Sequence, residues 1–135
     1  MSGGLLRWPG VELLTEPRGR GMTKQVLFAG ADVDVRYFEL EPGGWTPLEH
    51  HGHTHRVMVL RGRGACLVED TVRPLAPQDL VFVPSWAWHQ FRAAADAPLG
   101  FLCIVPAERD AGLAPGPADL VRLRAIPAVA DFLSS

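Results

Sequence analysis

The sequence predicts an all-β domain that ends in short helices. Two observations carry this prediction. Short runs rich in Val, Leu and Phe recur between Lys24 and Pro106, and Gly, Pro and Asp separate these runs. Strands at such regular short spacing, with turn residues between them, are typical of an antiparallel sandwich or barrel. No helix-length periodic segment interrupts them, which disfavours alternating strands and helices.

Eight runs are expected to form the strands, because β-branched and aromatic residues favour a pleated, half-buried surface. In chain order they are KQVLFAG, VDVRYFEL, HRVMVL, GACLVED, TVRPL, DLVFVP, HQFRA and LGFLCIV. We expect these runs to build one barrel core over about residues 24–106.

The pattern changes after the last of these runs. In segment 118–125, Leu120 and Leu123 follow helical spacing, and Pro117 suits the start of a helix. Pro127 then opens a second short apolar segment. We expect a helical tail at about 117–133, packed on the outside of a single domain that spans residues 1–135.

Composition excludes several classes of protein. The chain has 135 residues and a formal net charge of -2, so it carries no basic field for nucleic acid. No apolar run approaches the roughly 20 residues needed to cross a bilayer, and the N-terminus lacks a signal-peptide pattern. We expect a cytoplasmic protein that binds neither nucleic acid nor membrane. Cys66 and Cys103 lie in strand-like text and are expected to be buried, reduced thiols.

Four of the five histidines crowd into the stretch from Thr46 to Gly64. In a strand, alternate side chains share a face, so Glu49, His51, His53 and His55 would point the same way and His50 the opposite way. Gly52 and Thr54 favour a bend there, so the sequence does not decide to which face the His53 side chain points. We expect His50 and His53 to face solvent or to support the other donors.

The fifth histidine, His89, follows the run DLVFVPSWAW, and the strand that it begins could bring it beside the first cluster. His51, His55 and His89, together with the carboxylate of Glu49, would then form a metal site. Imidazole suits Zn, Cu, Fe and Ni, and a carboxylate adds a preference for harder ions such as Mn. The expected cofactor is therefore one divalent ion of Mn, Fe, Ni, Cu or Zn.

Two stretches resemble the sequence motifs of the cupin family. PGGWTPLEHHGHTHRVMVLRGRG is similar to the first cupin motif, and LAPQDLVFVPSWAWHQF is similar to the second. The resemblance implies a double-stranded β-helix, or jelly-roll barrel, with a metal inside one mouth. It places Glu49 where the family has its first histidine, His51 on its second, His55 on its usual glutamate and His89 on the second-motif histidine.

The resemblance implies a metal-dependent cupin enzyme that acts on a small organic molecule, with a dioxygenase-like reaction preferred. A metal-dependent isomerase or lyase is an alternative, because a bound ion can also act as a Lewis acid. A noncatalytic module that binds or senses a small molecule is a second alternative. Glu49 is expected to be a ligand and a catalytic group, or else a nearby base that orients an imidazole.

The expected substrate contacts are aromatic. Trp45 precedes the histidine cluster, Trp86 lies just before His89, and Phe91 would share the inward face of His89. An apolar mouth of this kind favours an aromatic or enolic molecule over a phosphorylated sugar. A homodimer is also expected by analogy with small cupins. Its surface would comprise Arg56, Met58, Leu60 and segment 11–14.

Overall fold

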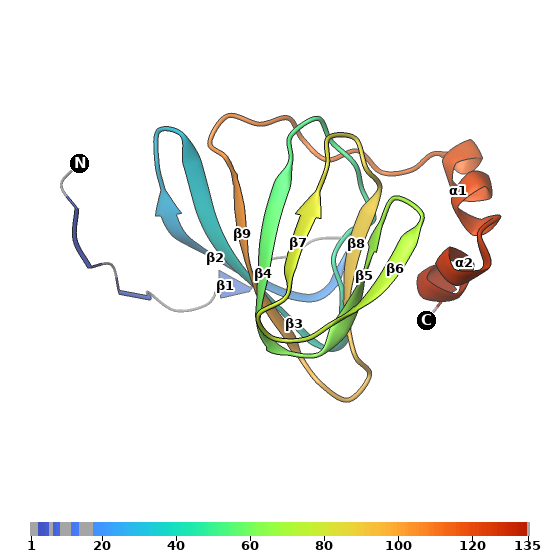
Figure 1. Ribbon diagram of the computed structural model, residues 1–135, viewed down its shortest axis with the longest axis horizontal. Helices are drawn as coiled ribbons and strands as arrows, with labels where there is room; N and C mark the ends of the chain where they lie inside the picture. The colour runs from blue at the N-terminus through green and yellow to red at the C-terminus, as the bar shows by residue number, and fades with distance from the viewer. Residues whose placement is uncertain (1–2, 6, 9–11, 14–17, 135) are drawn as a thin grey trace.

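The computed structural model describes residues 3–5, 7–8, 12–13 and 18–134. Its described part is a curled antiparallel sheet followed by two short helices (Figure 1), which confirms the all-β prediction. The strands are β1 (Glu12–Leu13), β2 (Arg20–Ala29), β3 (Val33–Trp45), β4 (His55–Gly62), β5 (Gly64–Val68), β6 (Thr71–Leu75), β7 (Leu80–Val83), β8 (His89–Ala93) and β9 (Leu99–Pro106). The helices are α1 (Pro117–Arg124) and α2 (Pro127–Ser134).

The strands pair in the order β6-β5-β8-β3-β9-β4-β7, and β2 also pairs with β3 while β1 pairs with β2. β3 joins the two halves of the sheet, because Val33 to Leu40 pair with β9 and Trp45 pairs with Arg92 of β8. β9 is hydrogen-bonded on both sides, to β3 and to β4. This order makes β9 the central strand of the wall that joins β3 and β4.

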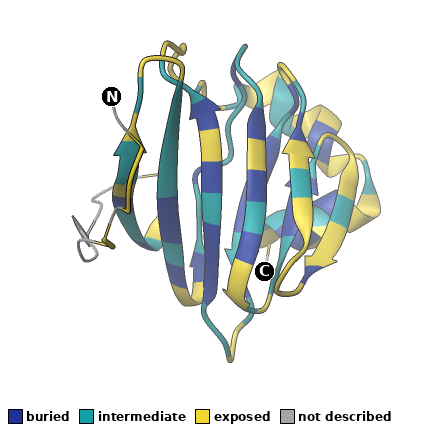
Figure 2. Cartoon of the chain, turned by 60° about the vertical axis from the view of Figure 1, so that its left-hand side comes forward, coloured by how far each residue is buried: buried dark blue, intermediate teal, exposed yellow. Residues whose placement is uncertain are grey.

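Burial alternates along the strands, as a closed sheet with one filled face requires. In β4, His55, Val57 and Val59 are buried, whereas Arg56 and Leu60 are exposed (Figure 2). The inward residues of the strands form one apolar cluster inside the barrel. It comprises Met22, Phe38, Leu40, Val57, Val59, Cys66, Leu75, Phe91, Ala93, Leu99, Phe101, Cys103 and Val105.

The two helices lie on the outside of the barrel and cover a second apolar cluster (Figure 1). Leu123, Val129 and Phe132 pack there against Leu67 of β5. Trp88 contacts the same cluster, so its role is packing. The helical tail that the sequence predicts is therefore present and seals the outer face of β5.

The structure differs from the sequence-based expectation between Glu49 and Thr54, where a continuous strand is wrong. β4 begins only at His55, and the preceding residues form a loop. Two backbone bridges hold this loop, Glu49 to His89 and His50 to Leu113. The N–H groups of Gly52 and His53 donate to the carboxylate of Asp110 instead of pairing with a strand.

Both cysteines are free and buried, as expected. Within the residues that the structure describes, no helix is long and apolar enough to cross a membrane.

Gly62, at the turn between β4 and β5, is expected to tolerate substitution poorly. Its φ is +80°, and a Cβ there would overlap with the carbonyl group of Pro98. Gly43 has a similar φ of +76° but open space around it. Gly43→Ala should cost about 1 kcal/mol for the left-handed backbone alone, and Gly62→Ala roughly 2 kcal/mol more because of the overlap. Urea denaturation of both variants measures this difference, and equal losses would contradict it.

Candidate metal centre and cavity

Three histidines meet at the open end of the barrel. His55 is the first residue of β4 and His89 the first of β8, two strands that β3 and β9 separate in the sheet, and both side chains are buried. His51 arrives from the loop before β4, and its carbonyl accepts a hydrogen bond of 2.8 Å from the N–H of Trp86. Reciprocal backbone bonds of 3.2 and 3.0 Å join Glu49 and His89. These bonds fix the loop against β8, which brings His51 next to His89.

Each of these histidines offers one ring nitrogen, and the three nitrogens all lie within 4.8 Å of one another. Nε2 of His51 lies 2.8 Å from Nε2 of His55. Among the described residues, His51, His55 and His89 are the set of side chains close enough to share one ion. The structure therefore brings together three of the four metal ligands that the sequence predicts.

Hydrogen bonds on the other ring nitrogens determine which nitrogen is free to bind. Nδ1 of His51 lies 2.8 Å from the carbonyl oxygen of His53, and Nδ1 of His89 lies 3.0 Å from that of Ala87. A carbonyl oxygen only accepts, so each Nδ1 carries the proton and each Nε2 is left with a lone pair. This is the usual arrangement of metal-binding histidines, whose second nitrogen donates to a fixed partner.

His55 is held differently. Its Nδ1 lies 2.9 Å from Sγ of Cys103, and its Nε2 faces the lone pair of His51. A cation held by His51 and His55 would satisfy both lone pairs, so the donor set fits a first-row transition ion. His55 then donates through Nδ1 to the cysteine sulfur.

Burial keeps the three rings neutral near pH 7. It lowers the pKa of His89 to about 4 and that of His55 to about 2, and it also lowers the pKa of His51. The neighbouring histidines add to the effect at His55 and His89, because positive charges that close repel one another. Neutral imidazole is the form that binds a metal ion.

Glu49 lies beside the three histidines but outside their ligand group. Its Oε2 accepts a hydrogen bond of 3.2 Å from Arg18, and its carboxylate packs against the backbone of Gly112. The carboxylate still lines the cavity that contains His55 and His89. Its roles as a ligand and as a catalytic group stay predictions.

The two remaining histidines support the site without joining it. Nδ1 of His53 lies 3.0 Å from Oδ1 of Asp110, and the His53 ring stacks on His51 at 3.7 Å between centroids. The ring of His50 stacks on Trp88 at 3.7 Å and is half-buried. Both positions agree with the expectation that His50 and His53 are not ligands.

A cavity of about 190 Å³ opens beside the histidines. It is smaller than the ~300 Å³ that drug-sized ligands usually need, so its size suits a small metabolite. Its lining residues are Met22, Lys24, Arg36, Phe38, Thr46, Pro47, Glu49, His55, Val57, His89, Phe91, Phe101 and Cys103. The expectation of a mouth with few charged groups is wrong, because Lys24, Arg36 and Glu49 line it.

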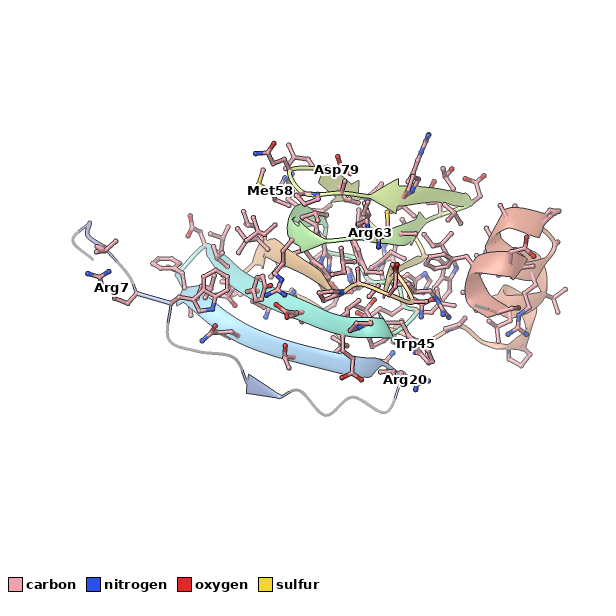
Figure 3. All side chains as sticks on the ribbon, turned by 90° about the horizontal axis from the view of Figure 1, so that it is seen from below. Arg7, Arg20, Trp45, Met58, Arg63 and Asp79 are labelled. Carbon is pink, nitrogen blue, oxygen red and sulfur yellow. The ribbon has the colours of Figure 1, made fainter. Side chains whose placement is uncertain are left out.

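Of the three aromatic substrate contacts that the sequence predicts, the structure brings Phe91 to the cavity. Trp45 is the last residue of β3 and lies near Arg20 (Figure 3). The guanidinium groups of Arg20 and Arg92 stand over its ring at 5.5 and 4.8 Å. Trp86 is 54% exposed and is outside the lining, with a φ of +63°. As substrate contacts, Trp45 and Trp86 stay predictions.

Four cavity or loop residues were not singled out from the sequence as functional. Cys103 and Arg36 meet across β3 and β9, where NH2 of Arg36 donates to Sγ at 3.5 Å. Lys24 shares the inward face of β2 with Met22. Asp110 holds the histidine loop from a distant segment. A polar residue on the inward face of a strand is the signal that could have revealed the first three.

Comparisons with known proteins support the fold. The family model described as "Cupin domain" matches residues 36–105. A protein of Rhodospirillum rubrum named 1-methylthio-D-xylulose 5-phosphate methylsulfurylase is 54% identical, over 94% of this chain and 86% of that protein.

Two crystal structures of similar proteins share the fold. A cupin-2 domain protein from Rhodospirillum rubrum has 51% identity and a TM-score of 0.89, covering 97% of this chain and 93% of that one. A cupin 2 conserved barrel domain protein from Rhodopseudomonas palustris has 44% identity and a TM-score of 0.85, covering 93% and 92%.

Acid is expected to destabilise the metal-free protein. The pKa of His89 falls from 6.5 in the unfolded chain to about 4 on folding, so the unfolded chain binds this proton more tightly. The contribution of His89 to the free energy of unfolding is complete above pH 6.5 and is lost as the pH falls toward 4. The shift in its pKa corresponds to roughly 3 kcal/mol of that free energy. Thermal unfolding of chelator-treated protein across this range measures the loss. His89→Asn should flatten the profile, and an unchanged slope in that variant would contradict the assignment.

Proposed function

This chain belongs to the cupin family, and on that premise we propose that it is a metal-dependent enzyme that removes the methylthio group of a methylthio-substituted ketose phosphate. The observation that carries the proposal is the position of Cys103, whose thiol lines the cavity next to His55. The relative from Rhodospirillum rubrum, which is 54% identical, is named for such a substrate. A methylthio group needs a soft acceptor, and a cysteine sulfur is one.

His51, His55 and His89 are the residues that would hold the metal ion. When bound, a divalent transition ion supplies Lewis acidity for a carbonyl group placed at its open positions. The protein's own part is to fix the three Nε2 atoms and to exclude water from the buried side of the centre. Part of the cavity wall is apolar, with Phe91, Phe101 and Val57 lining it.

Cys103 is the proposed acceptor of the methylthio group. Its sulfur attacks the thioether sulfur, so an S–S bond forms while the bond between that sulfur and the sugar carbon breaks. The electron pair of the broken bond passes to the sugar carbon and its neighbouring carbonyl group as an enolate, which then takes up a proton. The thiol proton balances this uptake, and the products are a methyl disulfide on Cys103 and a deoxy sugar.

Two neighbours prepare this thiol for reaction. Burial raises the pKa of Cys103, and the guanidinium group of Arg36 opposes that effect with its charge and its hydrogen bond. Nδ1 of His55 lies on the other side of the sulfur at 2.9 Å. Two equivalents of an external thiol then regenerate the enzyme: the first displaces methanethiol and forms a mixed disulfide with Cys103, and the second releases the Cys103 thiol and leaves with the first as their disulfide. Glu49 lines the same cavity and is the candidate for returning the proton to carbon.

This reaction uses no dioxygen, which separates it from the dioxygenase-like reaction expected from the sequence. Oxygen uptake that depends on substrate would support the dioxygenase instead. Tight binding of 1-methylthio-D-xylulose 5-phosphate without any product would support a noncatalytic module.

Cys103→Ser is expected to abolish methanethiol release from 1-methylthio-D-xylulose 5-phosphate, because oxygen cannot replace sulfur as the acceptor. Cys66→Ser is the matched control, since Cys66 is also buried and free but does not line the cavity. In the absence of reducing thiol, mass spectrometry should find one methylthio group on the wild-type chain and on Cys66→Ser. Elemental analysis of both variants should show unchanged metal. Full activity of Cys103→Ser would refute the mechanism.

We also propose that the outer face of β4, β7 and β9 joins a second copy of the chain. Met58 pairs there with Leu80 and Leu102, and Leu80 is 75% exposed (Figure 3 shows Met58 on this side). An exposed apolar sheet face of this kind is typical of an interaction surface. Arg56 adjoins it, 5.2 Å above the ring of Phe82. Val11 and Leu14, also expected at the interface, lie outside the described residues.

Leu80→Asp is expected to convert the dimer into a monomer, because it places a charge in the apolar contact. Val121→Asp is a matched control, since Val121 is also exposed, at 71%, but lies on α1. Light scattering coupled to gel filtration measures the masses. A wild-type monomer would refute the proposed interface.

A further inference from the structure

Two cationic side chains lie on one wall of the cavity. Lys24, the single lysine among the 135 residues, points inward from β2. Arg36 points inward from β3, and its guanidinium carbon stands 5.0 Å from the ring centroid of Phe38. Phe38 is the direct cross-strand partner of Lys24. Arg36 and Lys24 therefore both lie beside Phe38, the first by its guanidinium group and the second by strand register, on the wall formed by β2 and β3.

Arg36 has hydrogen-bonding capacity that the described residues do not use. Its Nε is buried and has no hydrogen-bond partner there. Its NH2 donates to the sulfur of Cys103, which is a weak acceptor. A buried donor without a partner destabilises the folded protein, so a bound oxyanion would be stabilised by supplying the missing acceptor.

Both cations line the cavity itself, together with apolar side chains such as Phe91 and Phe101. Cationic groups in a cleft with low-dielectric walls attract anions into it. Glu49 is the carboxylate among the lining residues, and Arg18 donates to it.

We infer that Lys24 and Arg36 form the subsite for the phosphate group of the substrate, an inference that rests on the proposed function. A guanidinium group binds phosphate oxygens in pairs, and an ammonium group adds a second charge, which suits a phosphate dianion. The strand order also supports this layout. β9 lies between β3 and β4, so Cys103 stands between Arg36 on one side and the wall of His55 on the other.

This arrangement orients the substrate in one direction. The carbonyl group lies toward the histidines, the methylthio sulfur lies at Cys103, and the phosphate lies at the wall of β2 and β3. The phosphate contact supplies binding energy at a distance from the bond that breaks, which serves to position the reacting sulfur.

The test compares D-xylulose 5-phosphate with D-xylulose by calorimetric titration of the metal-loaded protein. Neither sugar has a methylthio group, so binding is measured without turnover. The wild-type protein should bind the phosphate at least about tenfold more tightly, as expected for charge-assisted hydrogen bonds. Lys24→Met and Arg36→Met should each remove most of this preference, and Lys24→Arg should keep much of it.

Arg63→Met is the matched control, because Arg63 pairs with Asp96 outside this cavity and should leave the preference unchanged. Circular dichroism and metal content identify any variant that fails to fold. Equal affinity of the wild-type protein for the two sugars would overturn the inference. A preference that survives in folded Lys24→Met and Arg36→Met would overturn it as well.

The outcomes also separate this inference from the proposed function. A clear phosphate preference without methanethiol release would refute the proposed function alone. Methanethiol release without a phosphate preference would refute the inference alone.

Discussion

The hydrogen bonds from Nδ1 of His51 and His89 to backbone carbonyl groups are the constraint on which the rest of the site depends. They place the protons on the outer side of both rings and the lone pairs on the inner side. The acceptor for His51 belongs to His53, whose backbone is itself held by Asp110. The position of His51 relative to the other two histidines therefore depends on this loop, and the loop is held by β8 and by the segment after β9.

Much of the fold could be predicted from the sequence, because the strands alternate buried and exposed residues in a regular way. His55, Val57 and Val59 show this alternation, and the inward side of His55 followed from it. His89 was placed correctly for a similar reason, since a broken apolar run precedes the strand that it begins. The three histidines that the structure gathers were all predicted as ligands.

The remaining parts depend on contacts between segments that are far apart in the chain. Strand alternation predicts that Glu49 and His51 point to the same side. The carboxylate instead packs against Gly112 and pairs with Arg18, two contacts with distant segments that strand alternation does not reveal. Trp45 was expected at the cavity, yet it is not among the lining residues, and its ring contacts the guanidinium groups of Arg92 and Arg20. Cys103 lies in an apolar run, so the sequence predicts an ordinary buried thiol. Only the pairing of β9 with β3 shows that Arg36 lies beside it.

The central position of β9 has a consequence for the timing of the proposed reaction. Cys103 sits on a strand that is hydrogen-bonded along both edges, so its sulfur cannot swing out to meet a second molecule. The sugar and the reducing thiol must therefore reach it through the same cavity and occupy that cavity in turn. Such an enzyme follows a ping-pong order. At high concentration the sugar occupies the cavity of the methyl disulfide form, and the reducing thiol occupies the cavity of the free thiol form, so each reactant inhibits the step of the other.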